Sequence, residues 1–210
     1  MSDRKLVVLS QLAGPGLENV PKKWIFANRL PYEIRIFTRA SDTDTQLIFR
    51  DSIKENTVKE FEPSKFREGS QILAYIPIDK NINELAFPPA RLDGARPHVI
   101  FGGIEFTEIN DVSVRGHEHT VLPSIKITND FCLPISVYQN GKFVGLLGRN
   151  QPNRSDSSII LRGDSGIPLG TRYDFVDNKT KRSIGAVAIS SSAMRTINVG
   201  RIMSKESIKN

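Results

Sequence analysis

The chain has 210 residues, of which 39% are hydrophobic and 25% are charged, so its composition is ordinary for a compact protein and excludes wholesale disorder. A single cysteine, Cys132, excludes an internal disulfide and favours synthesis in a reducing compartment, so we expect the protein in the cytoplasm or in a virion. No apolar run is long enough for a signal peptide or a membrane span, so we expect neither classical secretion nor a transmembrane segment.

In the first half of the chain, short runs rich in β-branched and aromatic residues predict β-strands. These runs are Lys5–Leu12, Trp24–Asn28, Glu33–Thr38, Gln46–Arg50, Thr57–Phe61, Gln71–Ile76 and Val99–Phe106. One helical turn is expected at Asn81–Phe87, because the two prolines that follow would end it.

The second half shows the same pattern. Its predicted strands are Ser124–Thr128, Ile135–Gln139, Lys142–Leu147, Ser158–Leu161, Arg172–Val176, Ile184–Ile189 and Thr196–Ile202. Asn140-Gly141 predicts a two-residue hairpin, because both residues readily adopt the positive φ of a type I′ turn. A second helical turn is expected at Ser190–Arg195. Short strands separated by turn residues are typical of antiparallel sandwiches or barrels.

The two halves form an internal repeat. At an offset of 101 residues, apolar positions, asparagine and glycine keep their spacing, so that Asn28 falls on Asn129 and Gly69 falls on Gly170. Near the end of each half the offset becomes 98, which a three-residue deletion explains. A repeat of this length indicates tandem domains rather than a solenoid. We therefore predict an all-β protein of two tandem antiparallel β-sandwich domains, Greek-key or jelly-roll-like, at residues 1–103 and 104–210.

Two segments, Ile25–Phe37 and Gly170–Asp177, resemble strands of the β-sandwich domain of the von Hippel–Lindau family. The resemblance implies a sandwich in each repeat. That family recognises hydroxylated proline with Trp, Tyr, Ser and His side chains. Neither matching segment contains a histidine, so the resemblance transfers no binding residue.

The segment Arg162–Leu169 is similar to the nucleophile segment of chymotrypsin-like serine proteases. The resemblance would make Ser165 the nucleophile, with the Gly163 and Ser165 amides as the oxyanion hole. Such a protease needs a general-base histidine from its first domain, but the first half contains none before its end; the histidines are His98, His117 and His119. Because a serine without a base is a poor nucleophile, we interpret the segment as a tight glycine-rich turn.

Charged residues supply the candidate binding sites. Residues 179–210 contain seven basic residues and one acidic residue, which accounts for the whole net charge of +6. Such a surface could dock to an acidic protein or a polyanion. The candidates are Lys179, Lys181, Arg182, Arg201 and Lys205. The tripeptide Arg162-Gly163-Asp164 also occurs in cell-adhesion ligands, so Arg162 and Asp164 are further candidates. Both features also fit an ordinary solvated surface.

No phosphate-binding, zinc or calcium motif is present, so we expect no cofactor and no metal. His117-Glu118-His119 would need a third ligand to bind a metal, and a solvated loop is the simpler interpretation. We predict a non-enzymatic structural or assembly protein, such as a minor capsid protein or another virion component, that contacts other protein subunits. The alternatives are a monomeric module that binds a peptide or glycan, and a serine hydrolase that is active or degenerate.

Overall fold

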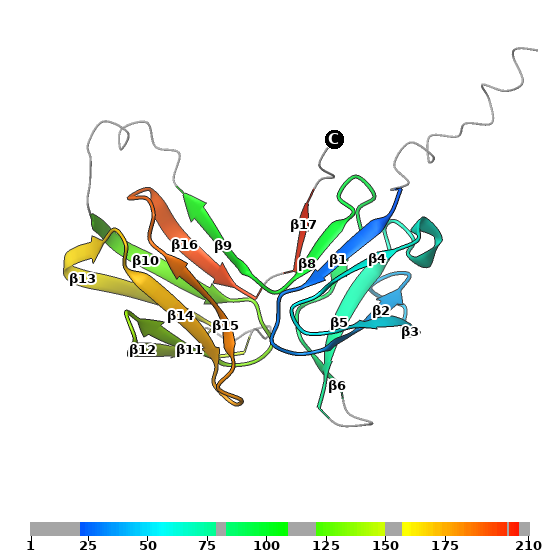
Figure 1. Ribbon diagram of the computed structural model, residues 1–210, viewed down its shortest axis with the longest axis horizontal. Coiled ribbons are helices and arrows are strands. Elements are labelled where there is room, and N and C mark those ends of the chain that lie inside the picture. Colours follow the sequence, from blue (N-terminus) through cyan, green and yellow to red (C-terminus); the bar gives the residue numbers. More distant parts are fainter. Residues whose placement is uncertain (1–21, 79–82, 109–120, 150–156, 201, 206–210) are drawn as a thin grey trace, which may run out of the picture.

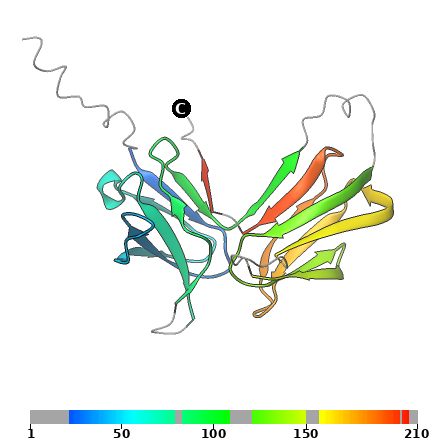
Figure 2. The ribbon, with the colours of Figure 1, turned by 180° about the vertical axis from the view of Figure 1, so that it is seen from behind.

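The computed structural model describes residues 22–78, 83–108, 121–149, 157–200 and 202–205. In this part of the chain every regular element is a β-strand, apart from one 3-10 turn, η1 (Pro63–Lys65). The strands build two β-sandwiches that splay from a shared junction into a V, as the front and back views show (Figures 1 and 2). The prediction of an all-β protein with tandem β-sandwiches is confirmed.

The N-terminal sandwich consists of one sheet in the order β17-β8-β1-β4 and a second in the order β3-β2-β5-β6, with β7 also paired to β5. Along β2 every second residue is buried, so each strand turns one face to the core. Rings of Trp24, Phe26, Phe61 and Phe66 meet there at centroid distances of 4.6–6.4 Å. Its strands from the first half are β1 (Trp24–Asn28), β2 (Ile34–Arg39), β3 (Ile48–Ile53), β4 (Val58–Phe61), β5 (Gln71–Pro77), β6 (Asn83–Leu85), β7 (Ala90–Arg91) and β8 (His98–Phe101).

The C-terminal sandwich has the sheet orders β13-β10-β16-β9 and β12-β11-β14-β15. Its buried side chains include Phe131, Tyr173 and Phe175. Its strands from the second half are β10 (Val121–Asn129), β11 (Ile135–Gln139), β12 (Lys142–Leu147), β13 (Ser158–Pro168), β14 (Arg172–Asp177), β15 (Ser183–Ala188) and β16 (Met194–Val199).

One strand pair in each sandwich is parallel, whereas the sequence led us to expect antiparallel sheets. β1 runs parallel to β8, and β10 runs parallel to β16. A parallel pair needs a long connection between its two strands. Here that connection contains the whole of the opposite sheet and one further strand of the same sheet, β4 or β13, before the chain returns to lie beside its first strand.

The internal repeat is visible in matching hydrogen bonds. The buried Asn28 side chain donates to the carbonyl of Tyr32 at 2.7 Å and accepts from the amide of Leu30 at 3.0 Å. Asn129 donates to the carbonyl of Leu133 at 2.8 Å and accepts from the amide of Phe131 at 2.9 Å. Each asparagine therefore closes the same turn after the first strand of its repeat.

The paired glycines are equivalent as well. Gly69 and Gly170 have φ of 76° and 84°, and each precedes the third strand of its second sheet, β5 or β14. Their amides donate to the carbonyls of Leu92 and Ile189 at 2.9 and 2.8 Å. The two residue pairs singled out by the repeat thus occupy equivalent positions in the two sandwiches.

The last strand of each repeat lies in the other repeat's sandwich. β9 (Ile104–Glu108) pairs with β16, and β17 (Ile202–Lys205) pairs with β8. Figures 1 and 2 show both strands leaving the junction on opposite arms of the V. β9 lies in the C-terminal sandwich, whereas β17, inside the predicted range 104–210, completes a sheet of the N-terminal sandwich.

The junction is packed with apolar side chains. The rings of Phe87 and Phe131, one from each half, lie 5.4 Å apart, and the amide of Cys132 donates to the carbonyl of Ala86 at 2.7 Å. The buried residues of both sandwiches form one continuous cluster. The two halves therefore share a core rather than being joined by a free linker.

Several local predictions are confirmed. β11 and β12 have the predicted limits, and Asn140 and Gly141 between them have φ of 48° and 82°. The predicted strand Val99–Phe106 is instead two strands, β8 and β9, because Gly102-Gly103 divides it, and Thr196–Ile202 is divided in the same way. The predicted strand Lys5–Leu12 lies outside the described residues.

Both predicted helical turns are wrong. Within Asn81–Phe87 the described residues include strand β6, which pairs with β5, and within Ser190–Arg195 a turn leads into β16. Edge pairing at β6 outweighs the weak local preference for helix. Among the described residues, no helix has the length and apolar character needed to cross a membrane.

Candidate functional site

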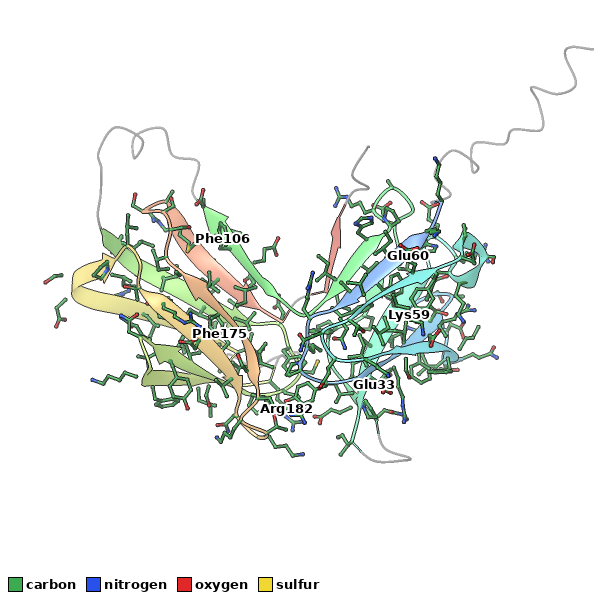
Figure 3. All side chains as sticks on the ribbon, viewed as in Figure 1. Glu33, Lys59, Glu60, Phe106, Phe175 and Arg182 are labelled. Atoms are coloured by element: carbon green, nitrogen blue, oxygen red, sulfur yellow. The ribbon has the colours of Figure 1, made fainter. Side chains whose placement is uncertain are left out.

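The predicted basic surface is only partly assembled in the structure. Lys179, Lys181 and Arg182 lie close together, exposed, on the loop between β14 and β15. Lys205 belongs to β17 of the N-terminal sandwich, on the opposite side of the junction from Arg182 (Figures 1 and 3). Arg201 lies outside the described residues. The compact part of this surface is therefore the loop 178–182.

Arg182 is engaged within the chain. Its guanidinium donates to the carbonyl of Pro31 at 2.5 Å, lies 3.5 Å from the carboxylate of Glu55, and stands 5.4 Å above the ring of Tyr32. All three partners belong to the N-terminal sandwich. Arg182 thus ties the two halves together, and only Lys179 and Lys181 remain as candidates for an external partner on this loop.

Asp177 anchors the same loop. It is fully buried and accepts hydrogen bonds from the hydroxyls of Tyr32 and Thr180 and from the backbone amide of Lys179. Burial acts to raise the pKa of Asp177, but these hydrogen bonds outweigh burial and hold the pKa below its usual value. Burial, followed by the hydrogen bond to Asp177, raises the pKa of the Tyr32 phenol. The group therefore works as an electrostatic tie between the halves.

The glycine-rich segment, which we predicted to be a tight turn, is instead part of the edge strand β13 and forms a bulge within it. Leu122 pairs with Ile167, and two residues later Ser124 pairs with Arg162, so residues 163–166 bulge out of β13. Gly166 has φ of 84°, and a side chain at Gly163 would collide with the Gly166 carbonyl. Both glycines are needed for this bulge.

The bulge leaves its polar side chains in solvent. Arg162, Asp164 and Ser165 are exposed at the outer edge of the C-terminal sandwich, far along the arm from the loop that carries Arg182 (Figures 1 and 3). The structure therefore does not bring the Arg162–Asp164 pair together with the basic loop.

No described histidine accompanies Ser165. His98 lies on β8, between Ile25 of β1 and Lys205 of β17, in the other sandwich. His117 and His119, which we assigned to a solvated loop from the sequence, lie outside the described residues. Within the described ranges, no three His, Cys, Asp or Glu residues are grouped so that they could hold a metal ion.

Sequence reasoning missed an aromatic cluster on one sheet of each sandwich, the sheet that contains β2 or β11. In the N-terminal sandwich the ring of Phe37 lies 5.3 Å from the rings of both Phe49 and Tyr75. In the C-terminal sandwich the rings of Tyr138 and Phe143 lie 5.7 Å apart. We call the first group the N-terminal edge patch and the second the C-terminal edge patch.

The two edge patches are equivalent. Phe37 pairs with Phe49 across β2 and β3, and Tyr138 pairs with Phe143 across β11 and β12, with a register shift immediately before each pair. Phe49 is 54% exposed and Phe143 is 55% exposed, and both lie on strands at the end of a sheet. Three aliphatic side chains near these rings in the chain are also exposed: Leu47 and Ile48, just before Phe49, and Leu146, on β12 with Phe143.

An available signal for these patches was the repeat itself, since Phe37 and Tyr138 are among the residue pairs that it aligns. Periodicity alone assigned the aromatic residues to strands but could not say which face of the sheet they occupy. A strand edge with exposed aromatic side chains can bind protein, because both its backbone groups and its apolar surface lack cover.

No protein-family model matches the chain, and no curated protein matches it. Similar solved structures include extended synaptotagmin 2 as its SMP domain followed by its two C2 domains, with 12% identity over 81% of this chain and a TM-score of 0.18. They also include the two C2 domains of the same protein without the SMP domain, with 11% identity over 75% of this chain and a TM-score of 0.17. This chain covers 49% of the first structure and 69% of the second. At these TM-scores the likeness carries no argument.

Proposed function

We propose that the protein is a non-enzymatic structural protein that assembles with other protein subunits. The observation that supports this proposal is the pair of equivalent edge patches. Each combines an end strand, β3 or β12, with an aromatic side chain that is more than half exposed. Exposed apolar surface at a strand edge is unfavourable for an isolated protein and becomes favourable when a partner covers it.

Two patches on one rigid chain make the protein bivalent. Because the two sandwiches share a continuous core, the distance and direction between the patches are set by the fold. A bivalent rigid unit can connect two neighbouring subunits, which is what a component of a particle must do. A minor capsid protein, or another virion component, is the form of assembly that we propose.

The test compares the size of the protein in solution for two double variants. Phe49→Ser/Phe143→Ser removes the most exposed ring from each patch. The control, Val58→Ser/Ile160→Ser, removes one aliphatic side chain of similar exposure, 56% and 58%, from an end strand of the other sheet of each sandwich. Light scattering after size exclusion measures self-association, and the native protein is examined for subunits that co-purify with it.

We expect the unaltered protein and the control variant to associate alike, and the patch variant to associate more weakly at the same concentration, with the same circular dichroism spectrum. A patch variant that associates as strongly as the control would show that the edge patches are not docking surfaces. A native protein that is monomeric at high concentration and carries no partner would contradict the assembly function and favour a monomeric recognition module.

A further inference from the structure

The exchanged strands β9 and β17 occupy identical registers in the two sandwiches. On β8, Phe101 lies opposite Ile202, and successive residues follow in antiparallel order. On β16, Val199 lies opposite Ile104 in the same arrangement. Because Ile104 and Ile202 are equivalent positions of the repeat, 98 residues apart, each acceptor strand receives the same position of an equivalent strand.

The short connections before these strands are compatible with two paths of the chain, a hairpin within one sandwich or a crossing to the other sandwich. β8 and β9 are joined by Gly102-Gly103 alone, and β16 and β17 by Gly200-Arg201 alone. Gly102 and Gly103 have φ of 78° and 133°, and two residues with positive φ are what a tight hairpin requires. In this structure the chain instead crosses to the other sandwich, and the Gly200 amide donates to the Gly103 carbonyl at 2.8 Å where the two crossings meet.

Each exchanged strand has a single neighbouring strand in its sheet. Both are end strands, paired on one side only, β17 with β8 and β9 with β16. Ile202 and Ile104 are partly buried against the core, whereas residues 106–108 of β9 are exposed, including Phe106, which projects from the strand in Figure 3. Either strand can therefore leave its sheet without breaking the pairing of any other two strands.

We propose that a second copy of this chain takes the place of the partner repeat, so that β17 of one copy pairs with β8 of another. β8 cannot distinguish β17 of its own chain from β17 of another copy, because β17 of any copy has the same residues and fits the same register. This mode of self-association goes beyond the proposed function, since it uses β8 and β17 rather than the edge patches on β3 and β12.

Concentration decides which copy supplies the strand. A strand attached through a short connection meets its own acceptor at an effective concentration on the order of 1 mM or more. Exchange within the chain therefore prevails in dilute solution, and exchange between chains grows as the protein is concentrated. A crowded assembly is the condition in which linked copies would accumulate.

The experiment uses full-length chains with one engineered cysteine each, in a Cys132→Ala background. Burial raises the pKa of the Cys132 thiol to about 11, so it reacts slowly, and the substitution removes it altogether. One chain carries Ile100→Cys and the other Met203→Cys, two positions that face each other across β8 and β17. Opposed residues of antiparallel strands lie within the Cα distance range of a disulfide.

The two chains are mixed at increasing concentration, oxidised, and separated without reductant. A control mixture replaces Ile100→Cys with Ile25→Cys, on β1, which β8 separates from β17. A single chain with both Ile100→Cys and Met203→Cys tests the pairing within one copy. We expect that chain to form an internal disulfide, and the mixed chains to form a linked dimer at least several-fold more abundant than in the control mixture, rising with concentration.

Two results would overturn the proposal. One is an internal disulfide in the double variant together with no linked dimer in the mixture at any concentration. The other is self-association, measured by light scattering, without the linked dimer. The second result would leave association through the edge patches intact, so failure of strand exchange is distinguishable from failure of the proposed function.

Discussion

The matched asparagines allow one prediction to be made twice in the same molecule. Asn28→Ala removes a buried amide that donates to the carbonyls of Tyr32, Ile53 and Lys54 and accepts from the amide of Leu30. The contacts to Ile53 and Leu30 are fully buried, so no water replaces them. A buried group left without a partner costs about 1–3 kcal/mol, and two such groups give a loss of about 2–6 kcal/mol in the free energy of unfolding.

Asn129→Ala should cost the same. Its buried partners are the carbonyl of Leu133 and the amide of Phe131, and the carbonyl of Gly148 is the half-buried third. We therefore expect a loss of about 2–6 kcal/mol at this position as well, by the same reasoning.

Urea unfolding measures both losses. The fluorescence of Trp24, the single tryptophan, reports on the N-terminal sandwich, and circular dichroism reports on both sandwiches. Gln139→Ala, at a half-buried position on β11, is the control and should change the free energy of unfolding by less than about 0.5 kcal/mol. A loss below about 1 kcal/mol for either asparagine would refute the reasoning that these side chains close the two turns.

Three further predictions concern the junction and the basic loop. Gly200→Ala should destabilise the protein by about 2–5 kcal/mol, because the residue has φ of 82° and a new Cβ would lie 2.5 Å from the Cβ of Phe131. The control Gly69→Ala, at a residue with φ of 76° and open space around it, should cost only about 1–2 kcal/mol. Equal losses for the two variants in urea unfolding would contradict the contact with Phe131. Asp177 has a lower pKa in the folded state than in the unfolded state, so its stabilising contribution is complete above the unfolded pKa of about 3.9 and disappears as the pH falls through the folded pKa. The advantage of the unaltered protein over Asp177→Asn should therefore shrink as the pH falls below about 4 in urea titrations, and a constant advantage would exclude the carboxylate as its source. Lys179→Glu/Lys181→Glu should weaken binding to an acidic partner at low salt and have little effect at high salt; affinity that is independent of both would mean that this loop is only a solvated surface.

The sequence by itself determined the elements whose causes are local. The hairpin of β11 and β12 was predicted to the residue, because Asn140-Gly141 specifies the turn and the flanking residues alternate. The repeat identified Asn28 with Asn129, because each asparagine closes its turn through residues within four positions. The further bonds of Asn28 to Ile53 and Lys54, and of Asn129 to Gly148, depend on the fold.

The candidate site was predicted less well. The sequence placed Arg182 on a basic loop, but only the fold brings Pro31, Tyr32 and Glu55 against it and turns it into a tie between the sandwiches. The edge patches were assigned to the correct strands and to no function. Whether an aromatic residue is buried depends on which face of the sheet meets the second layer, and that is a property of packing.

Tertiary structure alone decided where β9 and β17 go. A strand keeps its alternation and its hydrogen-bonding groups whichever strand it pairs with. From the sequence, Val99–Phe106 therefore looks like one continuous strand, and only the fold shows that the chain changes direction at the two glycines in its centre. Because the repeat makes β8 and β16 nearly equivalent acceptors, local sequence does not separate the local hairpin from the exchange. The choice rests on how the two crossings pack at the junction, where Gly200 bonds to Gly103 and its backbone lies against Phe131.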